Sequence, residues 1–228
     1  MTFAELPARL AEVRARIAAA QARAGRTGPV TIVAVTKTFG PEAVVAAVRS
    51  GLTAVGENRV QEALSKQDAL PELGVDWHLV GTLQKNKARH AAGRFALIHS
   101  VDRLDLAAEL DRRMAGDGVQ RVLVQVNCSG EPQKGGVEPA ALPELLDGLR
   151  ALSRLEMRGL MTMAELTDDP MRQRRAFALL RRLRDESQAR GHALPDLSMG
   201  MSGDFETAVE EGATMVRLGT ILFGGRSA

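Results

Sequence analysis

The 228-residue sequence contains no tyrosine, one cysteine (Cys128) and one tryptophan (Trp77). A single cysteine excludes an intramolecular disulfide and a metal site built from several thiolates. We therefore expect a reducing, cytoplasmic setting. Because aromatic residues make up only 3% of the chain, aliphatic side chains and nine methionines must fill the interior.

The sequence also lacks a dominant charge and a long apolar run. Lys and Arg total 30 against 28 Asp and Glu, so the net charge is only +2. Residues 1–21 place charged side chains inside an apolar period, which is typical of an amphipathic helix and not of a signal peptide or a membrane span. The arginine-rich residues 172–184 carry Phe177, Leu180 and Leu183 at helical spacing, which favours a solvated helix face over a nucleic-acid or membrane surface. No nucleic-acid or membrane partner is expected.

Short β-branched runs alternate with longer helical patterns from residue 30 onward. Helix starts are indicated at Pro41, Asp102, Pro139, Pro170 and Asp204. The expected strands cover residues 30–36, 53–56, 77–80, 96–100, 121–127, 155–160, 197–199 and 214–218. Eight strands, each followed by a helix, predict a single (β/α)8 barrel domain over residues 1–228, with an extra N-terminal helix.

A doubly wound open sheet is the structural alternative. No Gly-x-Gly-x-x-Gly motif follows the first strand, which argues against the dinucleotide-binding version of that fold. Glycine and proline predict two exposed loops, over residues 128–138 and 164–170.

Functional groups of such barrels lie where the strands end. Lys37 follows the apolar run of the first strand, where low-dielectric walls would favour the neutral amine that attacks an aldehyde. A lysine at this place is therefore a candidate for Schiff-base chemistry. A strand-end lysine that merely extends into solvent is the alternative.

The last two strand ends are rich in small residues. Residues 198–204 and 216–220 include Ser202, Gly203, Gly219 and Thr220, whose backbone N–H and hydroxyl groups could surround a phosphate. Each segment also precedes a predicted helix, whose dipole would favour the anion. Ordinary strand-to-helix turns are the alternative, but two adjacent ones of this kind favour the phosphate site.

Arg217 lies inside the eighth predicted strand. If its side chain pointed inward to a pyridine nitrogen, it would donate a hydrogen bond and leave that nitrogen uncharged, because a guanidinium does not give up its proton. An unprotonated pyridine is a weak electron sink, so a cofactor held in this way would stabilise a carbanion poorly.

These segments resemble those of the pyridoxal phosphate homeostasis proteins, which share the barrel of the alanine racemase N-terminal domain. The resemblance runs nearly end to end. It rests on residues 34–37 (AVTK), 56–62 (GENRVQE), 77–81 (WHLVG), 83–87 (LQKNK), 100–102 (SVD), 159–161 (GLM), 197–202 (LSMGMS) and 216–220 (VRLGT).

The resemblance implies that pyridoxal 5′-phosphate is bound as a Schiff base on Lys37. It also implies that Arg217 meets the pyridine nitrogen, that Asn58 lies beside the cofactor, and that Ser202, Gly219 and Thr220 hold the phosphate. A role in cofactor homeostasis, with transfer to apo-enzymes, follows from the same likeness. Arg59 and the pair Gly81-Thr82 depart from the family, which often has tyrosine and Gly-Pro there.

The related racemases use a tyrosine from a second domain of a partner subunit as a second base. The sequence has no tyrosine and ends directly after the expected last barrel helix. We therefore expect a non-catalytic, monomeric cofactor carrier. His78 and Cys128 could in principle replace that base, but a structural histidine and an inert thiol are the favoured interpretations.

Two other functions stay open at this point. One is a racemase-like pyridoxal-phosphate enzyme with an unassigned amino-acid substrate. The other is an aldolase or phosphosugar enzyme that forms a Schiff base on Lys37 without a cofactor. For Lys134, the alternatives are a solvated loop lysine and a residue on the route of the cofactor.

Overall fold

Eight short apolar runs form the parallel strands of a closed barrel in the computed structural model, which describes residues 3–225. The strands are β1 (Thr31–Val35), β2 (Ala54–Glu57), β3 (Asp76–Leu79), β4 (Leu97–Val101), β5 (Gln120–Gln125), β6 (Leu155–Met161), β7 (Asp196–Ser198) and β8 (Met215–Leu218). They pair in sequence order, and β8 pairs with β1 through Val33 opposite Arg217. The predicted barrel is confirmed, every strand boundary lies within two residues of its predicted place, and the open-sheet alternative is wrong.

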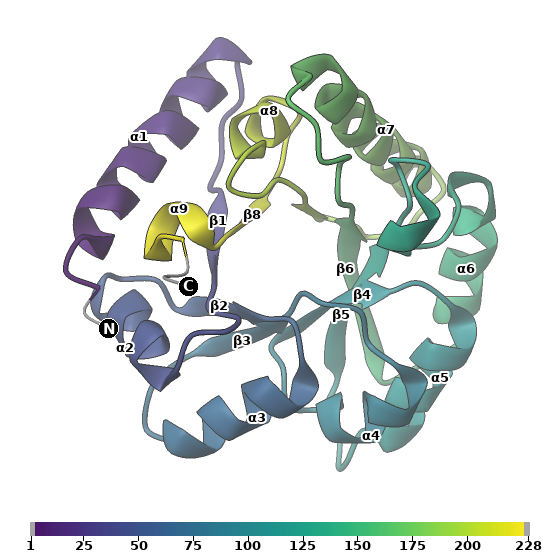
Figure 1. Cartoon of the computed structure of the whole chain (residues 1–228). Coiled ribbons are helices and arrows are strands. Elements are labelled where there is room, and N and C mark those ends of the chain that lie inside the picture. Colours follow the sequence, from purple (N-terminus) through teal and green to yellow (C-terminus); the bar gives the residue numbers. More distant parts are fainter. Residues whose placement is uncertain (1–2, 226–228) are drawn as a thin grey trace.

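Helices surround the barrel, as Figure 1 shows in a view along its axis. They are α1 (Leu6–Arg23), α2 (Pro41–Arg49), α3 (Val60–Ala69), α4 (Ala88–Ala91), α5 (Leu104–Arg113), α6 (Leu142–Leu149), α7 (Pro170–Ala189), α8 (Phe205–Glu210) and α9 (Thr220–Phe223), with 3₁₀ turns η1 (Lys85–Lys87), η2 (Pro132–Lys134) and η3 (Pro139–Ala141). Asp169 caps α7 by accepting a hydrogen bond from the N–H of Met171, which confirms that predicted helix start.

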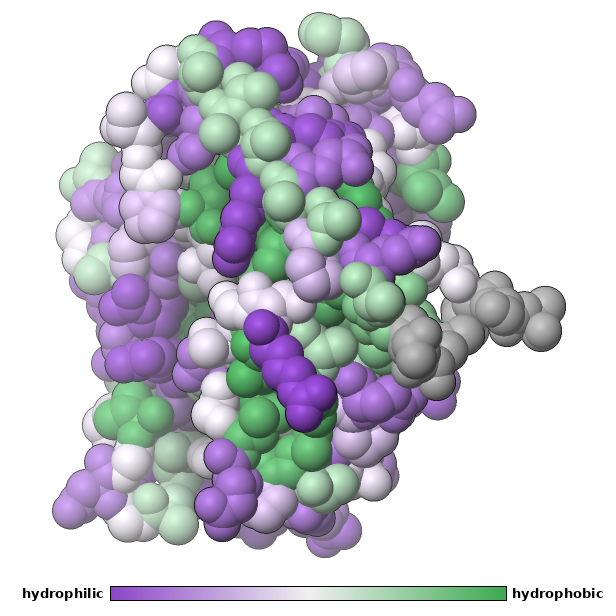
Figure 2. Space-filling view, turned by 90° about the vertical axis from the view of Figure 1, so that its left-hand side faces the viewer, coloured by the Kyte–Doolittle hydropathy of each residue, from purple (hydrophilic) through white to green (hydrophobic). Residues whose placement is uncertain are grey.

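The N-terminal helix completes this outer ring. Because α9 has only four residues, it cannot cover the junction of β1 and β8, and α1 lies between α2 and α8 in its place (Figure 1). Its stripe of Leu6, Leu10, Val13 and Ile17 is buried. The face shown in Figure 2 exposes mostly hydrophilic side chains, with hydrophobic ones visible between them.

The arginines of α7 are largely paired with neighbouring carboxylates. Arg174 contacts Glu210 and Glu211, and Arg181 also contacts Glu211. This arrangement agrees with the predicted solvated helix face. No helix within residues 3–225 combines the length and apolarity needed to cross a bilayer.

Three phenylalanine rings connect the N-terminal segment, the β1–α2 loop and α9. The ring centroids of Phe3 and Phe39 are 5.7 Å apart, and those of Phe3 and Phe223 are 5.5 Å apart, both with edge-to-face geometry. Such pairs add to the stability gained from burial alone. The cluster therefore fixes the loop that follows Lys37 against the end of the barrel.

We expect Phe223→Ala to lower the free energy of unfolding by about 3–5 kcal/mol, because it leaves a cavity in this cluster. Leu166→Ala is the matched control, since Leu166 is 94% exposed and its replacement should change stability by less than about 0.5 kcal/mol. Urea unfolding followed by circular dichroism measures both. Equal stabilities of the two variants would contradict the role given to the aromatic cluster.

Candidate functional site

A cavity of about 580 Å³ opens at the C-terminal ends of the strands. The polar residues predicted for the site come from four strands, β1, β2, β7 and β8, or from the residues directly after them. All six residues singled out from the sequence line this cavity: Lys37, Asn58, Ser202, Arg217, Gly219 and Thr220. The barrel thus brings together groups from both ends of the chain at one place.

Lys37 lies two residues beyond β1 and its side chain is exposed. The expectation that apolar walls would desolvate this amine is therefore wrong for the structure, because the cavity is open to solvent on this side. The Lys37 side chain lines the cavity from its solvent-exposed edge. Asn58, after β2, is partly buried, and Gly81 packs so closely on it that a Cβ at residue 81 would lie 2.3 Å from the Asn58 carbonyl oxygen.

The turn that carries Lys37 is held from below by α3. Lys66 donates a hydrogen bond to the Thr36 carbonyl oxygen at 2.9 Å, and Glu62 accepts one from the Thr38 N–H at 2.7 Å. Thr38 has a φ of 69°, a conformation that non-glycine residues adopt only when their surroundings impose it. These two bonds, on either side of Lys37, fix the direction in which its side chain leaves the backbone.

The same lysine neutralises a buried carboxylate between β2 and α3. Lys66 Nζ lies 2.6 Å from Glu57 Oε1 and 3.1 Å from Glu62 Oε1. Burial raises the pKa of Glu57, and the hydrogen bonds from Lys66 and Thr36 offset only part of that effect. Burial also acts to raise the pKa of Glu62, but the Thr38 N–H and Lys66 lower it overall.

Arg217 is buried inside the barrel, which confirms the inward orientation considered for it from the sequence. Its Nη1 donates to Ser198 Oγ at 2.7 Å and its Nη2 donates to the Thr162 carbonyl oxygen at 2.9 Å. Burial lowers the pKa of the guanidinium to about 10, so it stays charged at neutral pH. The cavity therefore has a fixed cation in its floor.

Two histidines continue the polar contacts of Arg217 into the barrel. His99 Nδ1 lies 2.9 Å from Ser198 Oγ, and His99 Nε2 lies 2.9 Å from His78 Nδ1. Burial lowers the pKa of His78 to about 4 and holds the pKa of His99 well below its usual value. Both rings are thus neutral at pH 7, in agreement with the structural interpretation of His78.

The predicted phosphate side of the cavity has free hydrogen-bond donors. Within residues 3–225, the N–H groups of Ser202 and Gly203 donate to no other group, and a Cβ at Gly203 would meet open space. The Ser202 hydroxyl faces the start of α9, where it accepts a bond from the Ile221 N–H at 3.3 Å. The expected contribution of helix dipoles is small here, because α8 and α9 have only six and four residues.

Several lining residues were not predicted to be part of the site, although Asp204 was expected to start a helix and residues 164–170 to form a loop. Asp204 is buried beside the phosphate side; burial raises its pKa, while its bond from the Met201 N–H and the charge of Arg217 act in the opposite direction. The loop at residues 165–168 forms a wall of the cavity. The pattern of neighbouring residues in the sequence does not indicate contacts of this kind, which form only when distant segments pack together.

Lys134 and Cys128 lie outside the lining of this cavity. Lys134 is partly buried, pairs with Glu131 at 2.7 Å and donates to the Ala164 carbonyl oxygen, so the interpretation as a freely solvated loop lysine is wrong. Burial raises the pKa of the Cys128 thiol to about 12, which agrees with an inert cysteine. No cluster of three or more metal-ligating side chains occurs in the described part of the chain.

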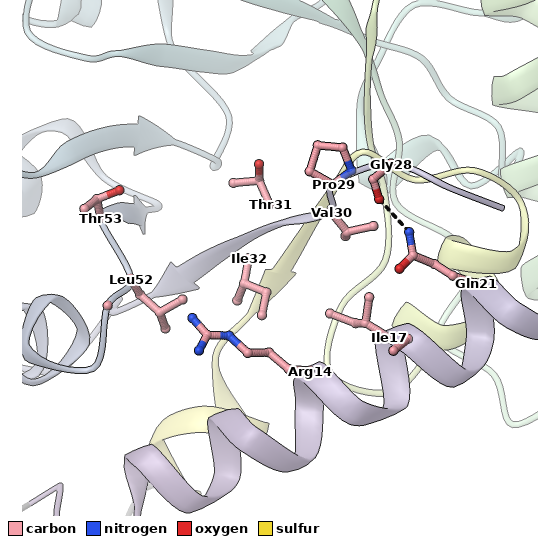
Figure 3. A pocket seen from close by; sticks show the side chains of 12 residues that line it. Arg14, Ile17, Gln21, Gly28, Pro29, Val30, Thr31, Ile32, Leu52 and Thr53 are labelled. Carbon is pink, nitrogen blue, oxygen red and sulfur yellow. Dashed lines mark hydrogen bonds between the residues drawn. The ribbon is translucent and has the colours of Figure 1, made fainter.

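A second cavity, of about 350 Å³, lies between α1 and the beginning of β1 (Figure 3). Its apolar lining includes Ile17, Ile32 and Leu52, and Gln21 Nε2 donates to the Gly28 carbonyl oxygen at 2.7 Å. Among residues 3–225, Arg14 is the one charged residue in its lining. None of the six predicted residues lies here, so the first cavity is the candidate site.

Known proteins match this chain over almost its whole length. A family model described as the alanine racemase N-terminal domain matches residues 8–227. A "Pyridoxal phosphate homeostasis protein" of Aquifex aeolicus is 47% identical over 221 residues, which cover 96% of this chain and 97% of that protein. A protein of the same name from Pseudomonas aeruginosa is 46% identical over 219 residues, or 95% of this chain and 94% of that protein.

A solved structure agrees with these matches. The structure of PipY from Synechococcus elongatus with PLP bound has a TM-score of 0.83 and 39% identity, and the match covers 96% of this chain and 100% of that one. The barrel and the family model define a protein of the alanine racemase N-terminal barrel class. Within that class, the chain belongs to the pyridoxal phosphate homeostasis protein family.

We expect Lys66→Met to lower the free energy of unfolding by about 3–5 kcal/mol, because it leaves the Glu57 carboxylate buried without its cation. The double variant Glu57→Gln/Lys66→Met should lose less, since the only charge left without Lys66 is that of Glu62, which is partly exposed to solvent. Urea titration at pH 7 compares the two. A double variant as unstable as Lys66→Met would show that the buried charge is not the cause.

A second prediction concerns acid stability. The pKa of His78 is about 4 in the folded protein and about 6.5 in the unfolded chain, so below pH 6.5 the unfolded chain binds protons that the folded protein does not. Stability should therefore fall between pH 6.5 and about 4, by about 3 kcal/mol from His78. In His78→Asn the amide oxygen can replace Nδ1 as acceptor without titrating, so the fall should be shallower. An identical pH dependence would contradict the buried, neutral state of His78.

Proposed function

We propose that this protein binds pyridoxal 5′-phosphate in the cavity at the C-terminal end of the barrel, as a Schiff base on Lys37. One observation carries the proposal: a single cavity is lined by an amine, a buried guanidinium and a group of small residues with free N–H donors. The aldehyde, the pyridine nitrogen and the phosphate of this cofactor need these three kinds of group.

The chemistry of the donors fits each part of the cofactor. Ser202 offers its N–H and hydroxyl to the phosphate, and Gly203, Gly219 and Thr220 line the same side of the cavity. Arg217 could donate to the ring nitrogen, because donation is the only hydrogen-bonding role of a guanidinium. We assign Asn58 to the edge of the ring on the family likeness and on its place in the lining.

The covalent step needs only the amine of Lys37. In its unprotonated form this amine would attack the aldehyde, with loss of water, and would so hold the cofactor covalently. The exposed position of Lys37 leaves the route to this amine open. When bound, the cofactor supplies an electron-accepting ring and a reactive imine.

We further propose that the protein holds and distributes the cofactor and does not turn over amino acids. The relatives are named homeostasis proteins, which supports this role. A donor such as Arg217 would leave the ring nitrogen unprotonated and the electron sink weak. The Cys128 thiol, with its pKa of about 12, is poorly suited to replace the racemase tyrosine as a second base.

The remaining parts of the proposal follow the sequence. One barrel domain over residues 1–228, a monomeric state, a cytoplasmic location and transient contact with apo-enzymes that receive the cofactor stay predictions. The second candidate function is a racemase-like enzyme that uses the same cofactor, and the barrel shared with the alanine racemase domain favours it.

We expect purified protein incubated with pyridoxal 5′-phosphate to show the near-ultraviolet and visible absorbance of a protonated Schiff base, which borohydride removes. Lys37→Ala should abolish this absorbance without unfolding the protein, since the residue is exposed. Lys85→Ala, at an exposed lysine outside the cavity, is the matched control. An unchanged spectrum in Lys37→Ala would refute the assignment, and turnover of an amino acid well above background would favour the enzyme.

A further inference from the structure

Four polar side chains form a continuous hydrogen-bonded chain inside the barrel. From the cavity floor it passes through Arg217, Ser198, His99 and His78, with successive distances of 2.7, 2.9 and 2.9 Å. The four residues come from β8, β7, β4 and β3. Buried polar chains are costly unless every donor and acceptor is paired, so the order of the hydrogens is strongly constrained.

Arg217, the donor at one end, sets the direction of every hydrogen bond in this row of four side chains. Arg217 can only donate, so Ser198 Oγ accepts from it. Within residues 3–225, the hydrogen of the Ser198 hydroxyl then has one acceptor within reach, His99 Nδ1. His99 consequently carries its hydrogen on Nε2 and donates to His78 Nδ1. The opposite order would leave the buried Ser198 hydrogen without an acceptor.

The neutral state of both rings is a condition for this order. A protonated His99 would present an N–H to the Ser198 oxygen that already accepts from Arg217, and two cations would face one hydroxyl. Burial and the charge of Arg217 both disfavour that state. At neutral pH the chain therefore runs in one direction, from the guanidinium to His78.

Neither histidine is among the residues that line the cavity, so any influence on a bound molecule must pass through Arg217. We propose that His99, supported by His78, is a positioning residue for Arg217: it turns the Ser198 hydroxyl so that a lone pair of Oγ points at Nη1 and so fixes the guanidinium that would donate to the pyridine nitrogen. This inference rests on the proposed function. With Thr162 holding Nη2, the Ser198 bond sets the second point that defines the plane of the guanidinium.

Four variants test the proposal by affinity for pyridoxal 5′-phosphate, by the absorbance maximum of the bound form, and by thermal stability. His99→Leu removes the acceptor for Ser198, and we expect affinity about tenfold lower and a shifted absorbance maximum, as for the loss of one hydrogen bond to a charged group. In His99→Asn the amide oxygen replaces Nδ1, and we expect near wild-type values. Ser198→Ala should reproduce the effect of His99→Leu.

The double variant Ser198→Ala/His99→Leu decides whether His99 acts through Ser198. If it does, His99→Leu adds no further spectral shift once Ser198 is gone. Additive shifts would overturn the proposal, as would His99→Leu or Ser198→Ala with wild-type affinity and spectrum, whatever their stability. The Ser198→Ala result decides the matter even if His99→Leu does not fold.

Wild-type protein gives the reference that separates the two levels of inference. A bound chromophore in the wild type with unchanged variants would refute only the positioning role. Absence of the chromophore in the wild type would refute the proposed function, and the positioning role with it.

Discussion

The hydrogen bonds between β1 and β8 are the constraint on which the site depends. They close the barrel and place Val33 beside Arg217 and Ala34 beside Leu218. Because both strands are parallel, their carboxyl ends meet at one rim, and Lys37 and residues 219–220 reach the same cavity. An open sheet with β1 and β8 at opposite edges would separate the amine from the small residues that face it.

The charges around the cavity are held in two separate places. Arg217 is a buried cation that donates to a serine hydroxyl and a backbone carbonyl, with two uncharged imidazoles behind the serine and the Asp204 carboxyl close enough to interact with its charge. On the other side of β1, Lys66 compensates Glu57 and anchors the turn that bears Lys37. Since buried charges are costly without partners, both arrangements indicate that the direction of Arg217 and of Lys37 is part of what the fold maintains.

Local patterns were sufficient to predict the fold. The β-branched runs marked all eight strands, and Pro41, Asp169 and Asp204 marked helix starts, because strand periodicity and capping are properties of neighbouring residues. Five of the six candidate site residues were found in the same way, from their places in or directly after predicted strands, whereas Asn58 came from the family resemblance. The structure brings all six together in one cavity.

Contacts between distant segments could not be predicted from these patterns. The chain from Arg217 to His78 joins four strands, and nothing near either histidine in the sequence indicates the other. The pairing of Lys66 with Glu57 depends on how α3 packs on β2. The sequence left both a desolvated and a solvent-extended Lys37 open, because its exposure depends on the open side of the cavity and not on the apolar strand before it.

The central claim is that one particular amine joins the cofactor. Reduction of the wild-type protein with borohydride in the presence of pyridoxal 5′-phosphate, followed by digestion and mass spectrometry, tests it most directly. The account predicts the mass of a reduced pyridoxyl phosphate group on the peptide that contains Lys37. The same group found only on another lysine, or on none, would contradict it.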